Sequence, residues 1–321
     1  MDKTKDAHLI DKPALSQIKV AAEVNRARKT GQPIVALESA VITHGLPWPT
    51  NLHLAHDLEE TVRGNGAVPA TIAVLDGQIR VGLSGSQLSD LAEARDSRKV
   101  SLRDLGAVVA QKGTGGTTVA ATMFLAEKTG VKVFATGGIG GVHRNAPFDV
   151  SADLQQLGRC PVMVVCSGAK SILDLPATLE CLETQGVPVI GYQTGAFPAF
   201  YALDSGLKVE IRADSPEEVA AIAETHWNLG LSSGILVVVP PPIEEAVPYE
   251  KMEKFIQEAL KQAEVSGIHG STLTPFLLSK INELSGGESM RANLALLRNN
   301  ARVSALIAAK MTVKPPVSRY L

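Results

Sequence analysis

The sequence predicts an α/β protein with three α/β/α layers, a mostly parallel central sheet and a helical C-terminal third. Short apolar runs alternate with longer amphipathic stretches up to about residue 240, and residues 249–309 show only helical patterns. Strands that alternate with helices form parallel sheets that helices cover on both faces. The 321 residues fit one large domain, 1–321, in which residues 1–13 are expected to form a flexible N-terminal arm.

The elements follow in order. The apolar run 34–37 predicts a buried strand, and Thr50 is expected to cap a helix that reaches Val62 and ends near Gly64. Asp76-Gly77 predicts a hairpin between 71–75 and 78–81. A helix at about 117–128 is expected to follow the loop at 113–116. Further strands are predicted at 131–135, 161–165, 187–192 and 235–239, and further helices at 249–264, 274–284 and 289–309.

Composition and charge exclude several classes of protein. The chain has 31 basic and 33 acidic residues, a net charge of -2, and few aromatic rings, so it lacks the basic surface of a protein that binds nucleic-acid polymers. Its three cysteines form no CxxC pair, so neither a disulfide framework nor a zinc knuckle is indicated. No apolar run is long enough to span a membrane. The sequence therefore predicts a cytoplasmic protein that binds a small molecule, with an organelle address left open.

Ionisable residues follow three of the predicted strands. Glu38 follows 34–37, His143 and Arg144 come after the glycine-rich segment beyond 131–135, and Lys170 follows 161–165. Ligands of open α/β sheets bind beyond the carboxyl ends of the strands, so these residues indicate a site built from several strands.

Each residue also has a purely structural interpretation. Glu38 is either a salt-bridged or capping carboxylate or a partly desolvated acid with a raised pKa. Lys170 is either a surface residue or an amine in the first turn of a helix, where the macrodipole favours its neutral, nucleophilic form. Lys99 by itself would be a solvated charge. The residues alone leave these alternatives open.

At two glycine clusters a ligand could approach the backbone closely. Gly113 to Gly116 open a predicted helix, where N–H groups bind a phosphate or simply form a tight turn. Gly138 to His143 resemble a dinucleotide-binding fingerprint, but His143 replaces the last glycine. A dehydrogenase is therefore the weakest of the functional hypotheses.

Two carboxylates lie close to a predicted helix start at Ser151. If Ser151 caps this helix, Asp149 stands in the preceding loop, where one carboxylate and several waters suit magnesium or manganese better than zinc. Asp153 alternatively serves only the helix N-terminus.

Together the segments resemble the pseudouridine-5'-phosphate glycosidase, or indigoidine synthase A-like, family. The resemblance rests on ordered motifs between about residues 30 and 310, nearly the whole chain. They are Ala36–Ser39, Thr43–Gly45, Pro69–Ala73, Thr136–Arg144, Asp149–Leu154, Ser167–Leu175, Pro198–Phe200, Thr274–Leu278, Ala292–Leu296 and Asn299–Ala301.

The resemblance implies reversible cleavage of the C–C glycosidic bond of pseudouridine 5'-phosphate to uracil and ribose 5-phosphate. It implies that Lys170 forms a Schiff base with C1' of the ring-opened ribose and that Glu38 donates a proton. It also implies a homotrimer with one Mn²⁺, or another divalent cation, held by Asp149 in each subunit. The substrate contacts that it implies are Lys99, Thr118, Val119, His143, Ser151, Ala152, Asp153 and Asn293.

The implied chemistry agrees with these residue types. A C-glycoside has no oxygen or nitrogen leaving atom, so the usual pair of carboxylates does not serve directly, whereas an imine supplies an electron sink. Lys99 and a metal would favour the neutral amine of Lys170. The segment 145–148, with Pro147, is shorter than is usual in the family, which makes the metal position an open question. The alternatives are a related activity on another phosphorylated sugar and a phosphosugar-binding protein without catalysis.

Overall fold

The computed structural model describes residues 17–144, 146–268 and 273–311. The expected N-terminal arm, 1–13, and residue 145 of the short segment lie outside these described residues.

The strands are β1 (Ile18–Val20), β2 (Ile34–Leu37), β3 (Val68–Leu75), β4 (Gln78–Val81), β5 (Arg98–Val100), β6 (Gly115–Thr117), β7 (Val133–Ala135), β8 (Val142–His143), β9 (Ala146–Val150), β10 (Met163–Cys166), β11 (Leu173–Asp174), β12 (Val189–Tyr192), β13 (Ile211–Ala213) and β14 (Ile235–Val238).

The helices are α1 (Ala22–Thr30), α2 (Thr50–Gly64), α3 (Gly85–Glu93), α4 (Leu102–Ala110), α5 (Val119–Lys128), α6 (Ala152–Leu157), α7 (Leu175–Thr184), α8 (Pro216–Asn228), α9 (Tyr249–Val265), α10 (Leu273–Leu284) and α11 (Glu288–Ala308). A π-helical turn, η2 (Val41–Gly45), follows β2, and a 3₁₀ turn, η3 (Ile243–Glu245), precedes α9.

The main sheet is mostly parallel, as the sequence predicts. Its path runs β1-β4-β3-β2-β7-β10-β14-β12-β13, with β6 joined to β3 and β5 to β6. From β3 to β13 every neighbouring pair on this path is parallel, whereas β3 pairs antiparallel with both β4 and β6. A separate antiparallel sheet has the order β11-β8-β9. The parallel core brings the carboxyl ends of β2, β7 and β10 to one edge.

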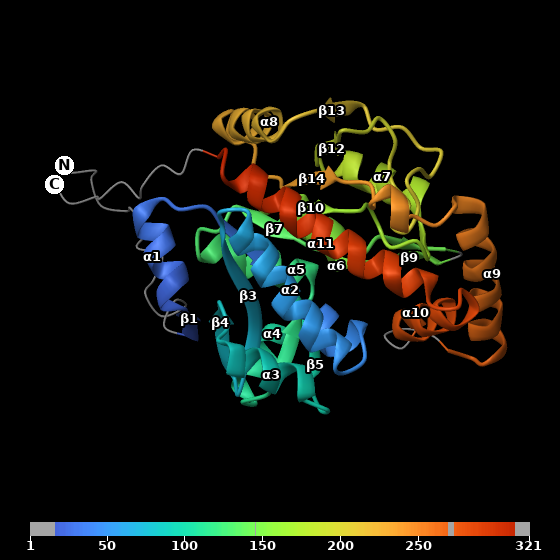
Figure 1. Ribbon diagram of the computed structural model, residues 1–321, viewed down its shortest axis with the longest axis horizontal. Helices are drawn as coiled ribbons and strands as arrows, with labels where there is room; N and C mark the ends of the chain where they lie inside the picture. Colours follow the sequence, from blue (N-terminus) through green and yellow to red (C-terminus); the bar gives the residue numbers. More distant parts are fainter. Residues whose placement is uncertain (1–16, 145, 269–272, 312–321) are drawn as a thin grey trace, which may run out of the picture.

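Helices cover both faces of this sheet (Figure 1). On one face α1 and α2 lie against β3, while α11 crosses β2, β7 and β10 and contacts α2 and α8. On the other, α5 packs against β2 and α6, and α6 contacts α7. The central strands β2, β7, β10 and β14 consist of apolar residues, and Phe134 and Met163 are completely buried. This arrangement confirms the predicted α/β/α fold class.

Most of the predicted elements are present, with differences at two helix starts. The hairpin around Asp76-Gly77 is formed by β3 and β4, and Ser151 caps α6 by accepting the Asp153 N–H at 3.2 Å. The expectation that Thr50 caps a helix is wrong, because Thr50 is the first residue of α2 and Pro49 holds the cap position. The helix expected from residue 117 begins only at Val119, because Gly115–Thr117 pair with β3 and β5 as a strand.

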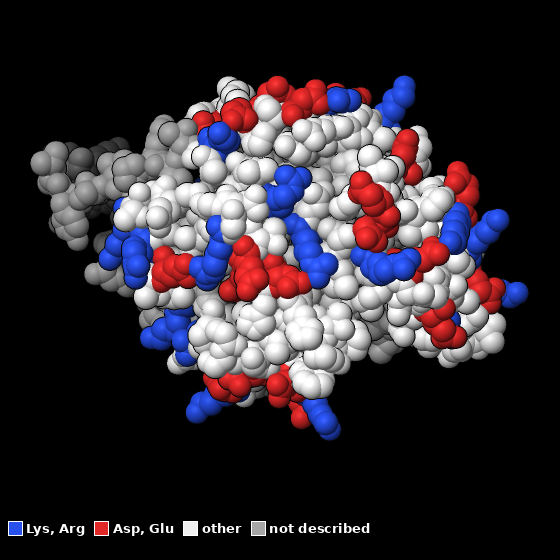
Figure 2. Space-filling model, viewed as in Figure 1, with Lys and Arg blue, Asp and Glu red and all other residues white. Residues whose placement is uncertain are grey.

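Acidic and basic side chains are interspersed on the face that carries α2 and α11 (Figure 2). This mixture agrees with the net charge of -2 and contrasts with the continuous basic surface that a nucleic-acid polymer requires. No helix among the described residues is long and apolar enough to cross a membrane.

Candidate active site

A small cavity of about 80 Å³ lies at the carboxyl ends of β2, β7 and β10. Its polar lining includes four predicted site residues, Glu38, Lys99, Lys170 and Asn293, together with His44 and Thr136. Strand ends and β5 supply the first three, and α11 supplies Asn293. The remaining walls include Phe200 and Leu278. The predicted meeting of polar groups beyond neighbouring parallel strands is thus present in the structure.

Glu38 lies directly after β2 and accepts a hydrogen bond from the Thr136 hydroxyl, which follows β7. Burial raises the pKa of its carboxyl; the attraction of Lys170 and the hydrogen bond from Thr136 oppose this rise but do not cancel it. A carboxyl in such a setting holds its proton to a higher pH than an exposed glutamate. This favours the interpretation of Glu38 as an acid over that of a structural carboxylate.

Lys170 reaches the same cavity from the segment after β10. Its backbone N–H donates to the Ile139 carbonyl at 3.0 Å, and Ala169 forms a parallel bridge with Ile139. The interpretation of Lys170 as an amine in the first turn of a helix is wrong, because β11 follows it and α7 begins only at Leu175. Lys170 therefore does not lie at a helix N-terminus, and its side chain interacts electrostatically with Glu38 and Lys99.

Lys99 and His44 form a second group at the cavity. Burial and the repulsion of Lys170 lower the pKa of Lys99, although the attraction of Glu38 opposes the shift. Burial and then Lys99 also lower the pKa of the His44 imidazole, which shares a hydrogen bond of 2.7 Å with the Thr43 hydroxyl. The amines of Lys99 and Lys170 therefore repel each other, and this repulsion, with burial, favours the neutral form of Lys99.

Asp153 is a buried carboxylate with fixed geometry. Its Oδ1 accepts the Ala120 N–H at 2.9 Å, in the first turn of α5, and its Oδ2 accepts the Gly140 N–H at 2.8 Å. These bonds bring Thr118 and Val119, at the start of α5, close to Ser151 and Asp153 at the start of α6. Asp153 also repels the Glu38 carboxylate and attracts Lys99, so it belongs to the electrostatics of the site.

The other predicted contacts lie farther from the cavity. His143 is half-buried in β8 and pairs with Leu173, three residues after Lys170. Ala152 and Asp149 are exposed, and neither lines the cavity. The structure brings Glu38, Lys99, Lys170 and Asn293 together, with Asp153 beside them.

Asp149 offers one exposed carboxylate at the edge of the antiparallel sheet, in β9. No group of three or more His, Cys, Asp or Glu residues forms a metal cluster in 17–144, 146–268 and 273–311. A single carboxylate with open space around it fits a hard divalent cation that keeps most of its waters, and does not fit a structural zinc.

At both glycine clusters the backbone lies close to other atoms of the protein and not to open space. A Cβ at Gly116 would collide with the Ser39 carbonyl, and one at Gly138 would lie 2.9 Å from the Gly168 carbonyl. Gly115 and Gly116 lie in a strand and not at a helix start, so the structure does not support the interpretation of this cluster as a helix-opening phosphate loop.

Two residues beside the site, Asn300 and Phe200, were not singled out as individuals by the sequence. Asn300, completely buried on α11, donates to the Thr136 carbonyl at 2.9 Å and to the Ser167 hydroxyl at 3.2 Å, so it ties the ends of β7 and β10 together. Phe200 has a φ of 60°, in the left-handed region, and its ring lies against Gly137 and Gly138. Both occur within the quoted motifs, but only their contacts show what they do.

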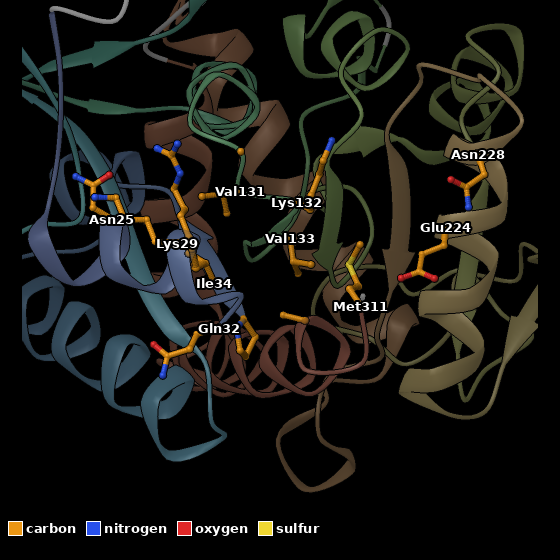
Figure 3. Close-up of a pocket in the computed structure, with 14 residues that line it drawn as sticks. Asn25, Lys29, Gln32, Ile34, Val131, Lys132, Val133, Glu224, Asn228 and Met311 are labelled. Atoms are coloured by element: carbon orange, nitrogen blue, oxygen red, sulfur yellow. The ribbon is translucent and has the colours of Figure 1, made fainter. Parts of the chain in front are cut away.

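A larger cavity of about 510 Å³ lies at the opposite, amino-terminal ends of the strands (Figure 3). Ile34 and Val133, the first residues of β2 and β7, line it together with Lys29 and Lys132. None of the predicted catalytic residues is near this cavity, so volume alone does not identify the site of chemistry.

The comparisons with known proteins agree with this geometry. Residues 23–310 match the family described as "Indigoidine synthase A like protein". The chain is 54% identical over 299 residues to the pseudouridine-5'-phosphate glycosidase of Herpetosiphon aurantiacus, covering 92% of this chain and 99% of that protein. It is 51% identical over 296 residues to the protein of the same name from Solibacter usitatus, covering 92% and 99%.

Two solved structures are also similar. The indigoidine synthase A-like protein of Thermotoga maritima is 36% identical, with a TM-score of 0.83 over 91% of this chain and 96% of that one. The prealnumycin C-glycosynthase AlnA, in complex with ribulose 5-phosphate, is 39% identical, with a TM-score of 0.85 over 92% and 97%.

Gly140 provides a test of the packing around Asp153. A Cβ at this position would lie 2.6 Å from the Ser151 Cβ and 2.9 Å from Asp153 Oδ2, so Gly140→Ala should displace the start of α6. We expect the free energy of unfolding, measured by urea denaturation, to fall by about 1–3 kcal/mol, as for other overpacked positions.

Gly64→Ala is the matched control, because a Cβ at Gly64 has no atom within 4 Å and the residue lies in α2. We expect it to leave stability unchanged or raise it by up to about 1 kcal/mol. Equal stability of the two variants would contradict the tight packing at Gly140.

Proposed function

The chain belongs to the indigoidine synthase A-like protein family, and we propose that it is an enzyme that reversibly cleaves pseudouridine 5'-phosphate to uracil and ribose 5-phosphate. Relatives at 50–54% identity that bear the name pseudouridine-5'-phosphate glycosidase support this assignment. The observation that carries it is the shared cavity of Glu38 and Lys170, with Lys99 beside them.

Lys170 is the proposed nucleophile. Its neutral amine forms a bond to C1' of the ribose as the ring oxygen leaves with a proton. The nitrogen lone pair then forms the C=N double bond as the bond from C1' to uracil C5 breaks. Water later hydrolyses this imine, which releases ribose 5-phosphate and restores the amine.

Glu38 is the proposed proton donor to uracil C5. The electrons of the breaking C–C bond remain on C5, and they need an acid at that point. The raised pKa of Glu38 supports this role, because it keeps a larger share of the carboxyl protonated near neutral pH than in an exposed glutamate. After the proton transfer, the Thr136 hydroxyl donates a hydrogen bond to the Glu38 carboxylate and stabilises it.

Asp149 is the proposed ligand of a divalent cation, manganese or another, one per subunit. When bound, the cation would supply positive charge for the oxygens of the phosphosugar. The remaining substrate contacts proposed from the family resemblance are Thr118, Val119, His143, Ser151, Ala152, Asp153 and Asn293. The buried position of Asp153 beside Lys99 supports its place among them.

A homotrimer is proposed as the assembly, and the surface of β9 supports self-association. The Phe148 side chain is 99% exposed and that of Val150 42% exposed, in a strand at the edge of the β11-β8-β9 sheet. An exposed apolar sheet edge is typical of an interface.

We expect light scattering to give the mass of a trimer for the native chain and a smaller mass for Phe148→Asp. If the Phe148→Asp variant still has the mass of a trimer, the surface of β9 is not the interface.

One observation favours a second candidate function. The solved C-glycosynthase AlnA, at 39% identity, was crystallised with ribulose 5-phosphate. An activity that makes or breaks a C–C bond on another phosphorylated sugar would use the same amine and acid. Comparing pseudouridine 5'-phosphate with a panel of pentose and ketopentose phosphates separates the two candidates.

Turnover of pseudouridine 5'-phosphate tests the proposed function directly. Incubation with pseudouridine 5'-phosphate should release uracil, faster with added manganese than with a chelator, as followed by chromatography. Borohydride added with ribose 5-phosphate should reduce the imine and attach a pentose phosphate to Lys170, which mass spectrometry locates. Lys170→Ala should lower the rate by at least about a thousandfold because it removes the nucleophile.

Lys29→Ala is the control, since Lys29 lines the cavity at the opposite end of the strands and should leave the rate unchanged. An active native enzyme without any adduct on Lys170 would rule out the imine mechanism. Uracil release that Lys170→Ala retains in full would do the same.

The pH dependence of the rate tests the role of Glu38. Cleavage needs protonated Glu38, so the rate should decline as the pH rises through the pKa of this carboxyl. The hydrogen bond from Thr136 stabilises the ionised form and lowers this pKa. Thr136→Val should therefore raise the pKa of Glu38 and move the alkaline decline of kcat/KM to a higher pH, whereas Thr136→Ser should not. A decline that moves to lower pH would contradict the assignment of Glu38 as the acid.

A further inference from the structure

The Arg144 side chain binds the backbone of residues 171–173, which follow Lys170. The Arg144 Nη2 donates to the Ser171 carbonyl at 2.9 Å, and Nε donates to the Leu173 carbonyl at 3.1 Å. The Leu173 N–H in turn donates to the Lys170 carbonyl at 3.0 Å. Arg144 therefore binds the tight turn that immediately follows Lys170.

The same guanidinium binds a carboxylate from a distant helix. Its Nη1 donates to Glu253 Oε1 at 2.5 Å and its Nη2 to Glu253 Oε2 at 3.0 Å, a bidentate pair with α9. The side chains of Arg144 and Glu253 are only 18% and 27% exposed. Gln257, one turn later in α9, donates to Glu253 Oε1 at 2.6 Å and holds the carboxylate in place. Pairs of this planar, forked geometry resist rotation in a way that a single ion pair does not.

Two parts of the active site meet at this pair. The loop from Thr136 to Arg144 contacts the nucleophile's segment on both sides of Lys170, at Ile139 before it and at Arg144 after it. Helix α9 packs against α10, which contributes Leu278 to the wall of the catalytic cavity. A displacement of α9 relative to the turn would therefore change where the amine of Lys170 lies relative to that wall.

We propose that Arg144 and Glu253 are positioning residues for Lys170, which hold the turn 170–173 against α9 so that the amine points into the catalytic cavity. This inference rests on the proposed function, in which Lys170 is the nucleophile. Neither side chain lines that cavity, so their effect on catalysis is through the backbone of the turn. The pKa of Glu253 agrees with this pairing: burial raises it, but the hydrogen bonds from Arg144 and Gln257 bring it below its usual value, so the carboxylate stays charged.

The test compares Arg144→Lys and Glu253→Gln with a matched variant, Glu288→Gln. Glu288 also pairs with α9, through Lys251 at 2.7 Å, but that pair joins α9 to α11 and does not contact the turn after Lys170. Glu253→Gln and Glu288→Gln keep the size of the side chain and each removes one ion pair of α9, whereas Arg144→Lys keeps the positive charge and removes the forked geometry. Circular dichroism and urea denaturation establish that each variant is folded.

The kinetic measurement is the rate at which borohydride-trapped adduct forms on Lys170 with ribose 5-phosphate. We expect this rate and kcat to fall about 10- to 100-fold in Arg144→Lys and Glu253→Gln, because small displacements of a nucleophile cost rates of this order. KM should change less than about threefold, and Glu288→Gln should behave like the native enzyme. Unchanged adduct formation in folded Arg144→Lys and Glu253→Gln would overturn the proposal.

A second measurement does not depend on activity. Hydrogen exchange of the Lys170 and Leu173 amides, which donate to Ile139 and Lys170, should accelerate in Arg144→Lys and Glu253→Gln and stay unchanged in Glu288→Gln. If the native enzyme forms no adduct, the proposed function fails, but this exchange still shows whether the pair holds the turn. Equal exchange in all variants would refute the positioning role in either case.

Discussion

The parallel pairing of β2, β7 and β10 is the constraint on which the site depends. Parallel strands end at a common edge, so Glu38 after β2, Thr136 after β7 and Lys170 after β10 converge although they are far apart in the chain. The helices over both faces keep water from this sheet, and the charged groups at its edge are partly desolvated. Burial then raises the pKa of Glu38 and lowers that of Lys99.

A second level of structure holds the strand ends in place. Asn300 joins the ends of β7 and β10, Asp153 joins α5 to the glycine-rich loop through two backbone N–H groups, and Arg144 joins the turn after Lys170 to α9. Each of these side chains forms hydrogen bonds with backbone groups of another segment of the chain. The loops of the site are therefore fixed by polar side chains from other elements, and reactive groups on them keep a defined geometry.

The larger of the two cavities described above does not contain the predicted catalytic residues. The cavity of about 510 Å³ at the amino-terminal ends of the strands is larger than the one of about 80 Å³ around Glu38 and Lys170. Only the small one combines a carboxyl of raised pKa with two neighbouring lysines. A site in an open α/β protein is identified by which groups meet at the carboxyl ends of the strands, and far less by volume.

The sequence by itself determined the fold class, the hairpin at Asp76-Gly77 and the family, and it offered Ser151 as a cap, because periodicity, turn chemistry and ordered motifs are local properties of the chain. It also indicated Glu38 and Lys170 by their places after apolar runs. Only the tertiary structure decided that no helix begins at Lys170, that Gly115 and Gly116 belong to a strand, and that Asn300 and Arg144 hold the strand ends. These outcomes depend on contacts between residues distant in the sequence, and neither spacing nor propensity encodes such contacts.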